Sequence, residues 1–344
     1  MRQTCDVCVF GAGPAGAATA ARLADFGVSV ILLDRPPRNK PWRGESLTGA
    51  IRHPLTTLGL WRDFCAAEHV PTYEQRTAWG GEPWTKDSIF HSQGNLWHVD
   101  RARFDDDLRR AALQRGVPLI EYVALHDLRR DREQWLLTAD DDIEVSSNYL
   151  VDATGRASAI ARRLGARSRV CDRLVGLTAL LTRNENPEFS HAMVIESTPH
   201  GWWYAAPVPQ GHVLAFFTDA DLAPRELARS MRTVAANSAF TQGENGQGWL
   251  TVGDACAAHD PLCGWGVSRA MTNGILAADA IACFVKSGDA SLIEQYLGHC
   301  RTQFEQYLTG LTRHYSFEQR WAAFPFWERR ANWMVSSTSE EIHG

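Results

Sequence analysis

Residues 5–16, Cys-Asp-Val-Cys-Val-Phe-Gly-Ala-Gly-Pro-Ala-Gly, join an apolar run to a glycine-rich turn, and an alanine-rich stretch follows. We expect Gly11 to make the tight turn, Gly13 to let the backbone approach a pyrophosphate, and Gly16 to let a helix lie close to the strand. An anion is favoured at the N-terminus of such a helix. Asp34 ends the next apolar run, where a carboxylate accepts the hydroxyls of an adenosine ribose and repels a 2′-phosphate. The stretch therefore predicts a β-α-β unit that binds FAD or NAD rather than NADP.

The composition narrows the class of protein. The chain has 344 residues, enough for two closely joined domains, and a formal net charge of −5, which argues against nucleic acid as a partner. Eight cysteines without an evident disulfide framework predict free thiols in a reducing compartment, and therefore a cytoplasmic location. Cys5 and Cys8 fall on the predicted buried strand, so we expect no metal site there. The apolar run 275–285 is too short to span a membrane, and we expect no signal peptide before the glycine turn.

The periodicity of apolar residues predicts the elements beyond the first unit. Residues 100–115 read as a charged helix with one apolar face, formed by Phe104, Leu108, Ala111 and Ala112. The Trp-rich stretch 71–98 reads as irregular. The remaining expectations are a helical stretch to about residue 67 interrupted by Pro54, strands at 118–122, 134–138, 148–152 and 249–252, alternating strands within 170–218, an amphipathic helix at 222–236, and helices from about 267 onward.

A second glycine motif lies far along the chain, where Gly253-Asp254-Ala255 is followed by His259-Asp260-Pro261-Leu262-Cys263-Gly264-Trp265-Gly266. Together with the first motif, Arg43-Gly44-Glu45-Ser46 and Arg101-x-x-Phe104-Asp105, it resembles the p-hydroxybenzoate-hydroxylase-fold flavoproteins. The resemblance spans most of the chain and implies FAD as the cofactor. In that family the aspartate holds the ribityl chain, and the later turn presents backbone N–H groups to the flavin pyrimidine, where they stabilise a reduced, anionic ring.

The resemblance implies a set of contacts with FAD and a division into domains. The implied contacts are Gly11, Ala12, Gly13, Ala15, Gly16, Asp34, Arg35, Arg43, Arg101, Val123, Gly253, Asp254, Pro261, Gly264, Trp265 and Gly266. The expected fold class is α/β with an α+β insert: a Rossmann-like FAD-binding domain, an inserted antiparallel-sheet substrate domain, and C-terminal helices. The expected domains are 1–70, 99–165 and 245–310 for FAD, 71–98 and 166–244 for the substrate, and 311–344 for a helical tail.

Two further stretches narrow the resemblance within that family. Val151-Asp152-Ala153-Thr154-Gly155-Arg156 is similar to the halogenase and geranylgeranyl-reductase branch, and the Asp-Gly motif that serves NADPH in simple hydroxylases is absent. The stretch His200-Gly201-Trp202-Trp203-Tyr204-Ala205-Ala206-Pro207 resembles a tryptophan-halogenase motif with two departures. The whole pattern is more similar to the small flavoproteins that mature tryptophylquinone cofactors. The resemblance implies hydroxylation of a partner protein's tryptophan through a flavin C4a-hydroperoxide, with O₂ and either NADH or a separate flavin reductase.

The site residues for this chemistry are hypotheses with structural alternatives. His259, which adjoins the flavin turn, and then His53 are the candidate bases, although an ordinary core or surface histidine is the favoured interpretation of each. Trp202, Trp203 and Tyr204 could form an aromatic wall against the substrate, or an ordinary strand with one buried face. The competing functions are a flavin-dependent halogenase, for which Lys86 is the one plausible lysine, an isoprenoid reductase, and a non-catalytic assembly factor.

Overall fold

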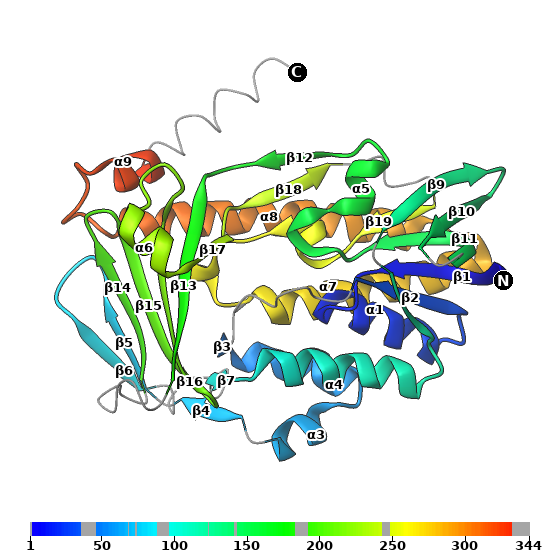
Figure 1. The fold of residues 1–344 in the computed structure, drawn as a ribbon, viewed down its shortest axis with the longest axis horizontal. Helices are drawn as coiled ribbons and strands as arrows, with labels where there is room; N and C mark the ends of the chain where they lie inside the picture. The colour runs from blue at the N-terminus through cyan, green and yellow to red at the C-terminus, as the bar shows by residue number, and fades with distance from the viewer. Residues whose placement is uncertain are drawn as a thin grey trace.

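The computed structural model describes residues 2–35, 46–67, 69–72, 74–87, 96–122, 124–140, 143–182, 192–242 and 248–331. Two large β-sheets stand at the right and left of the view in Figure 1, with helices packed between and behind them. The predicted mixed α/β fold, with antiparallel strands inserted and helices at the end of the chain, is confirmed. Within the described residues, no helix combines the length and apolar character that a membrane span requires.

The first sheet carries the glycine turn at the carboxyl end of its central strand. In spatial order its strands are β8 (Leu119–Glu121), β2 (Val30–Asp34), β1 (Arg2–Phe10), β11 (Ile143–Asp152), β10 (Gln134–Ala139) and β9 (Leu125–Asp131), with β19 (Trp249–Thr251) also paired to β11. Strands β8, β2, β1, β11 and β19 are parallel, whereas β10 and β9 are antiparallel. Val7, Cys8 and Val9 are completely buried because both faces of β1 are covered, as the continuous apolar run requires.

Helix α1 (Pro14–Asp25) begins at the glycine turn and crosses α7 (Gly266–Ser287) at very close range. A Cβ added to Gly274 would lie 2.6 Å from the main-chain oxygen of Ala15, so only glycine allows the two helices to approach in this way. The Thr19 hydroxyl donates to the Gly274 oxygen at 3.1 Å across the crossing. The crossing thus places the first turns of α7 beside the start of α1.

The second sheet is mainly antiparallel. In spatial order its strands are β17 (Arg232–Ala235), β13 (Leu174–Thr182), β16 (Gly211–Asp219), β15 (Gly201–Val208), β14 (Met193–Thr198), β5 (Glu74–Ala78) and β6 (Trp84–Asp87). Only the β14–β5 pair is parallel. Trp202, Ala215 and Phe217 belong to the buried face, where they pack with residues of the C-terminal helices.

Helix α8 (Ser291–Ser316) joins the two halves of the molecule. Phe304 and residues N-terminal to it pack in the core of the first sheet, whereas Leu311 and Tyr315 pack in the core of the second. Helix α9 (Pro325–Ala331) then adds Phe326 and Trp327 to the second core. Figure 1 shows α8 as one long helix behind both sheets.

The remaining elements are short, apart from α4. They are α2 (Arg52–Thr57), α3 (Trp61–Ala66), α4 (Arg101–Gln114), α5 (Ala159–Arg163) and α6 (Arg225–Ser230), a sheet of β12 (Arg167–Val170), β18 (Ala239–Gln242) and β20 (Ala257–Ala258), and a sheet of β3 (Ser46–Leu47), β7 (Leu96–His98) and β4 (Val70–Thr72). Helix α4 buries Phe104, Leu108, Ala111 and Ala112, so its predicted apolar face is confirmed.

The predicted helix at 222–236 is wrong. The helix α6 is six residues long, and the chain then enters β17, which pairs with the outer edge of β13. Thr233 and Val234 lie opposite Leu177 and Gly176 in that ladder. Their β-branched side chains favour extended backbone, and the open edge of the sheet supplies hydrogen bonds that outweigh the helical pattern.

The stretch 71–98 was predicted to be irregular but contains most of β4 and all of β5, β6 and β7. These strands are short. Strands β5 and β7 pair with segments distant in the chain, and β6 pairs, among the described residues, only with β5, so the local sequence carries little signal for them. Strand β9 was also not predicted, because it is largely exposed and lacks apolar alternation. The helical stretch up to residue 67 begins with strand β3, and Gly59, at a φ of +72°, separates α2 from α3.

Candidate cofactor and reaction site

The first glycine turn has the shape that a dinucleotide needs. A Cβ on Gly11 would lie 2.4 Å from the main-chain oxygen of Ala153, and one on Gly16 would lie 1.8 Å from the oxygen of Gly11. Both glycines are therefore required by close packing of the turn on the end of β11. Gly13, in contrast, faces open space, with no heavy atom within 4 Å of an added Cβ.

The start of α1 is open to an anion. Its N-cap residue is Gly13, no side chain accepts a hydrogen bond from the first turn, and no acidic residue lies in that turn. Asp34 stands at the end of the adjacent β2, where burial raises its pKa although the backbone N–H groups of Ala12 and Arg35 stabilise its charge. The side chain of Arg35 lies over the ring of Tyr122, at 5.5 Å. This geometry suits a pyrophosphate at Gly13 and a ribose at Asp34.

Arg156 connects the parts of the second glycine motif. Its guanidinium lies 3.7 Å from the carboxylate of Asp254 and donates to the main-chain oxygen of His259 at 2.6 Å. Gly253 adopts a φ of +58°, and a Cβ there would meet Ala15 at 2.7 Å, which fixes this motif against the start of α1. In the sequence, Arg156 was informative only as the last residue of the stretch that resembles the halogenase and geranylgeranyl-reductase branch. Its position in the structure indicates that it holds Asp254 and the His259 main chain in register.

Several buried polar atoms around the second motif have no hydrogen-bond partner among the described residues. Thr48 Oγ1, Ser268 Oγ and Asn273 Oδ1 are of this kind. Ser268 and Asn273 lie in the first turns of α7, and the Thr48 methyl would lie 3.9 Å from a Cβ on Gly264. Buried polar groups are normally paired, so these atoms indicate where a polar ligand completes the site. The residues present therefore fit FAD.

Further residues that the resemblance implies for FAD lie in the turn before α7 and at the start of α4. Pro261 and Gly264 form the short turn before α7, with Gly264 at a φ of +64°, and Gly266 begins the helix. Trp265 between them is 48% exposed. Arg101, at the start of α4, pairs with Asp105 at 3.0 Å. Arg43 and Val123 lie outside the described residues. A contact between each of these residues and FAD stays a prediction.

Three polar side chains meet where the second sheet approaches this site, and we call them the seam: Ser46, His98 and Tyr204. Ser46 Oγ lies 2.6 Å from His98 Nδ1 and 2.5 Å from Tyr204 Oη. Ser46 and His98 face each other across β3 and β7, whereas Tyr204 comes from β15. Ser46 is two residues from Thr48, whose methyl group would lie 3.9 Å from a Cβ on Gly264, so the seam adjoins the turn before α7.

His98 is completely buried, and its Nε2 has no hydrogen-bond partner among the described residues. Burial, together with the charge of nearby His212, lowers the pKa of His98 to about 4, so the ring is neutral at physiological pH. Sequence reasoning missed this residue, because nothing in the stretch 71–98 distinguishes it. Ser46 was quoted only as the end of the Arg-Gly-Glu-Ser motif, and that motif was the one available signal.

The stretch Trp202–Tyr204 alternates between the two faces of β15. Trp202 is buried, stacks on Phe217 at 4.1 Å and donates from Nε1 to Tyr315 Oη at 3.1 Å. Trp203 points to the opposite face, where it contacts Phe216. The three rings therefore do not form a single wall, because consecutive strand residues point in opposite directions. Tyr204 is the member of the three that reaches the seam.

The two predicted bases lie apart from the seam. His259 is buried with its ring against Phe304 and Tyr307, and burial lowers its pKa well below the ordinary value. His53 is on the exposed surface of α2. A catalytic role for either histidine stays a prediction.

A buried network, which we call the anchor, joins the flavin turn to the C-terminal helices through Asp219, Asp260, Tyr315, Phe326 and Arg330. The Asp260 carboxylate accepts from Tyr315 Oη at 2.7 Å and from the backbone N–H of Leu262 at 2.9 Å. Burial raises its pKa to about 6. Arg330 pairs with Asp219 at 2.9 Å, and its guanidinium lies 3.5 Å from the centre of the Phe326 ring.

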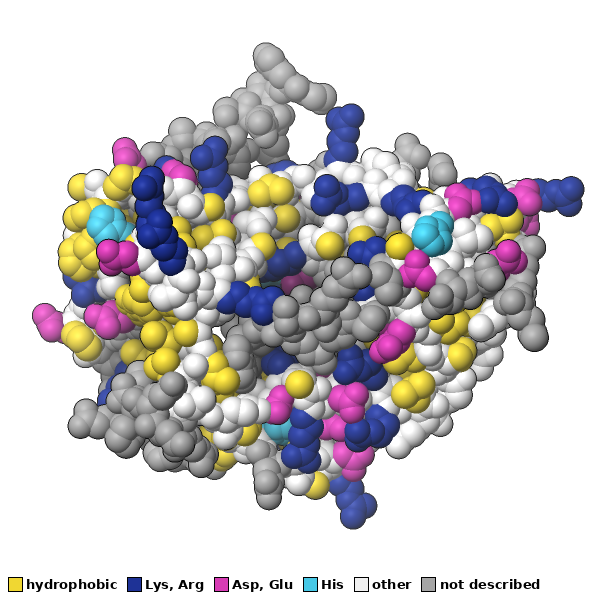
Figure 2. All heavy atoms as spheres, in the orientation of Figure 1, with side chains coloured by type: hydrophobic (Ala, Val, Ile, Leu, Met, Phe, Trp, Pro, Cys, Tyr) yellow, Lys and Arg dark blue, Asp and Glu magenta, His cyan; other side chains and the backbone are white. Residues whose placement is uncertain are grey.

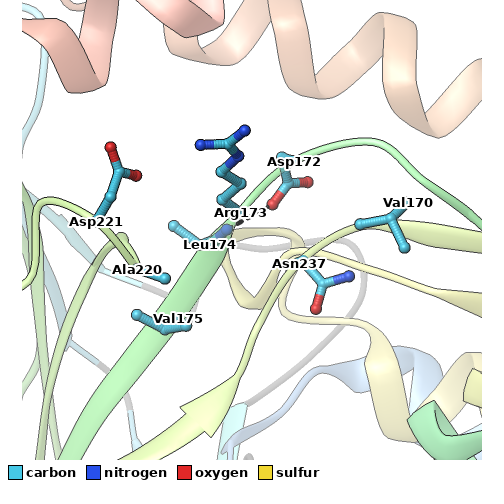
Figure 3. Close-up of a pocket in the computed structure, with 8 residues that line it drawn as sticks. All are labelled: Val170, Asp172, Arg173, Leu174, Val175, Ala220, Asp221 and Asn237. Carbon is cyan, nitrogen blue, oxygen red and sulfur yellow. Dashed lines mark hydrogen bonds between the residues drawn. The ribbon is translucent and has the colours of Figure 1, made fainter.

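A cavity of about 450 Å³ lies away from the seam, where β13 begins and β16 ends. Figure 3 shows the side chains of Arg173 and Asp221, two of its lining residues, extending in the same direction. None of the predicted site residues lines it. On the face drawn in Figure 2, acidic side chains lie among the basic ones.

Comparison with known proteins places the chain in a family. The model of the FAD binding domain family matches residues 4–230. LodB of Marinomonas mediterranea, named as an FAD-dependent oxidoreductase, is 29% identical over 95% of this chain and 97% of its own length. The 1H-pyrrole-2-carbonyl-[peptidyl-carrier protein] brominase of Pseudoalteromonas luteoviolacea is 28% identical over 83% of this chain and 79% of its own.

A solved structure shares the fold over nearly the whole chain. The peptidyl tryptophan dihydroxylase QhpG, essential for tryptophylquinone cofactor biogenesis, superposes with a TM-score of 0.77 at 23% identity, covering 96% of this chain and 79% of its own. The glycine cradle, the paired motifs and these matches agree on the cofactor, which is FAD. The chain belongs to the FAD binding domain family and is an FAD-dependent oxidoreductase.

Proposed function

We propose that this protein is an FAD-dependent monooxygenase that hydroxylates a tryptophan side chain of a partner polypeptide during the formation of a tryptophylquinone. The observation that carries the oxygenase is the seam, a neutral hydrogen-bonded chain of Ser46, His98 and Tyr204 beside the flavin turn. The activity named for QhpG, whose fold this chain shares, supports tryptophan as the substrate. FAD, when bound and reduced, supplies oxygen activated from O₂.

The protein's own residues then have three tasks. They must hold an electron-rich ring against the flavin, keep water away from the reaction, and remove one ring proton. The indole ring is already nucleophilic, so no cationic side chain is needed to activate it. The seam offers a partly buried aromatic ring at Tyr204 and hydroxyl groups that can exchange protons.

Halogenation is the second candidate, favoured by the similarity to the brominase. A halogenase of this family would need a lysine near the flavin ring to direct the oxidised halide. Lys286 lies over Phe26 in the last turn of α7, which is about 30 Å along the helix from Gly266. Lys86 lies on β6, the edge strand of the second sheet, and Lys40 is outside the described residues. The oxygenase is therefore the better-supported function.

The source of electrons and the compartment are part of the proposal. Either NADH or a separate flavin reductase would reduce the FAD, since the Asp-Gly motif for NADPH is absent from the sequence. A cytoplasmic location agrees with eight cysteines that are all free.

The test supplies chemically reduced, FAD-loaded protein with O₂, bromide, and either free tryptophan or a tryptophan-containing polypeptide from a candidate quinoprotein. Intact mass in ¹⁸O₂ then identifies the added atom. We expect the polypeptide to gain labelled oxygen and free tryptophan to stay unchanged. Bromine on either substrate would support the halogenase, and an unmodified polypeptide with complete reoxidation of the flavin would refute the proposal.

A further inference from the structure

The proposed hydroxylation leaves one proton to be removed. When an oxygen atom bonds to a ring carbon, that carbon still carries its hydrogen, and aromaticity returns only when the hydrogen leaves as a proton. The electron pair of the C–H bond then returns to the ring. A group at the reaction site must accept the proton, and geometry is the first criterion for such a group.

Neither histidine predicted from the sequence belongs to the seam. His259 is enclosed by Phe304 and Tyr307, and His53 lies on the exposed side of α2. The seam, in contrast, runs from a partly buried phenol to a completely buried imidazole through two short contacts of 2.5 and 2.6 Å.

The acidity of the three side chains determines which group donates in each hydrogen bond of the seam. A phenol is a better hydrogen-bond donor than an alcohol, so Tyr204 donates to Ser46, and Ser46 has one proton left to donate to His98 Nδ1. Nδ1 must then be unprotonated, which places the ring proton of the neutral imidazole on Nε2. The His98 ring is held in place because Ser46 and His98 face each other across β3 and β7.

We propose that Tyr204, Ser46 and His98 form a proton relay that accepts the ring proton released during hydroxylation. The inference rests on the proposed function and names the base for it. The substrate C–H proton passes to Tyr204 Oη, the Tyr204 proton passes to Ser46 Oγ, and the Ser46 proton passes to His98 Nδ1. Tyr204 is the catalytic residue, because it would touch the ring, while Ser46 and His98 are positioning and relay residues.

The burial of His98 suits this task. A buried imidazole whose Nε2 has no partner among the described residues is a poor base toward water and stays neutral between turnovers. The proton of an oxygenated, non-aromatic ring is far more acidic, so a weak base is sufficient. His212 is the titratable neighbour whose positive charge opposes protonation of His98, and it helps to return the relay to its neutral state.

The first measurement needs no substrate. Long-range ¹H–¹⁵N spectra of FAD-loaded, ¹⁵N-histidine-labelled protein report the tautomer of each of the 12 histidines. We expect His98 to carry its proton on Nε2, and Ser46→Ala, which removes one oxygen atom, to shift the His98 Nδ1 signal selectively. His98→Gln provides a second assignment. A proton on Nδ1 would overturn the relay whatever the substrate is.

The second measurement compares the hydroxylation of a tryptophan-containing partner polypeptide by wild type, Ser46→Ala and Tyr204→Phe. Both variants should reoxidise reduced flavin normally, because the oxygen atom is transferred before the ring proton leaves, but they should form the rearomatised, hydroxylated polypeptide about a hundredfold more slowly. Ring-deuterated tryptophan should give them a primary isotope effect that wild type lacks, a change that a purely structural defect would not produce. Ser146→Ala, which loses a buried hydroxyl bonded to Gln134, is the matched control.

The two measurements separate the two proposals. If wild type adds no oxygen to the polypeptide, the proposed function fails. If wild type adds oxygen and Ser46→Ala does so at the same rate without an isotope effect, the relay alone is wrong.

Discussion

Trp202 and Tyr204 lie two residues apart on one face of β15, but they belong to different hydrogen-bond networks. Trp202 bonds to the anchor, and Tyr204 is part of the seam. From Trp202, the anchor side continues to Tyr315 and Asp260, all of them buried and joined by hydrogen bonds. From Tyr204, the seam continues to Ser46 and to His98, whose Nε2 has no partner among the described residues. Both networks connect the second sheet to the surroundings of the flavin turn.

From this difference we infer that the anchor mainly stabilises the fold, whereas the seam takes part in the reaction. Buried charged and polar groups that bond to one another fix one arrangement of a core, and removing one member costs much stability because its buried partner loses an interaction. A network with a half-buried end and an unpaired nitrogen adds less stability but can exchange protons. We therefore expect substitutions in the anchor to lower the free energy of unfolding, and substitutions in the seam to change the reaction.

The largest expected effect is on the anchor. Arg329 and Arg330 both pair with Asp219, but their side chains are 39% and 1% exposed. Arg330→Met should lower the free energy of unfolding by about 3–5 kcal/mol, because it leaves the buried Asp219 with one partner fewer. Arg329→Met, the matched control, should cost less than about 1 kcal/mol. Equal losses in urea unfolding would show that the burial of Arg330 is not what matters.

The contributions of Asp260 in the anchor and His98 in the seam to the free energy of unfolding should change with pH in opposite directions, by less than the effect of Arg330→Met. Burial raises the pKa of Asp260 to about 6 and lowers that of His98 to about 4. Folded Asp260 binds its proton more tightly than the unfolded chain does, so its contribution to stability falls as the pH rises from about 4 to 6. Folded His98 binds a proton less tightly than His98 in the unfolded chain does, so its contribution to stability rises between about pH 4 and 6.5. Each of the two effects should be about 3 kcal/mol.

Urea unfolding of wild type, Asp260→Asn and His98→Gln at pH 4.5 and pH 7 tests this contrast. Relative to wild type, Asp260→Asn should gain stability on going to pH 7, whereas His98→Gln should lose it. Changes of the same sign in both variants would contradict the assigned protonation states.

The FAD-binding part of the site could be predicted from the sequence because the residues that form it lie close together in the chain. The positions of Gly11, Gly13 and Asp34 follow from a turn, a helix start and a strand end that are contiguous in the chain. The seam could not be predicted, because it joins residues on β3, β7 and β15 whose meeting depends on strand pairing between distant segments. The predicted helix at 222–236 failed for the same reason, since the edge of β13 determines that β17 is extended.

The most direct test of the account compares Tyr204→Phe with Trp327→Phe at equal FAD content. Trp327 belongs to the buried core beside the anchor, where its Nε1 donates to the Thr198 oxygen at 2.8 Å. Tyr204→Phe should keep the free energy of unfolding within about 1 kcal/mol of wild type and form hydroxylated polypeptide about a hundredfold more slowly. Trp327→Phe should lower the stability and keep the wild-type rate of hydroxylation. A wild-type rate from Tyr204→Phe, or a slowed rate from Trp327→Phe alone, would contradict the claim that the reaction occurs at the seam.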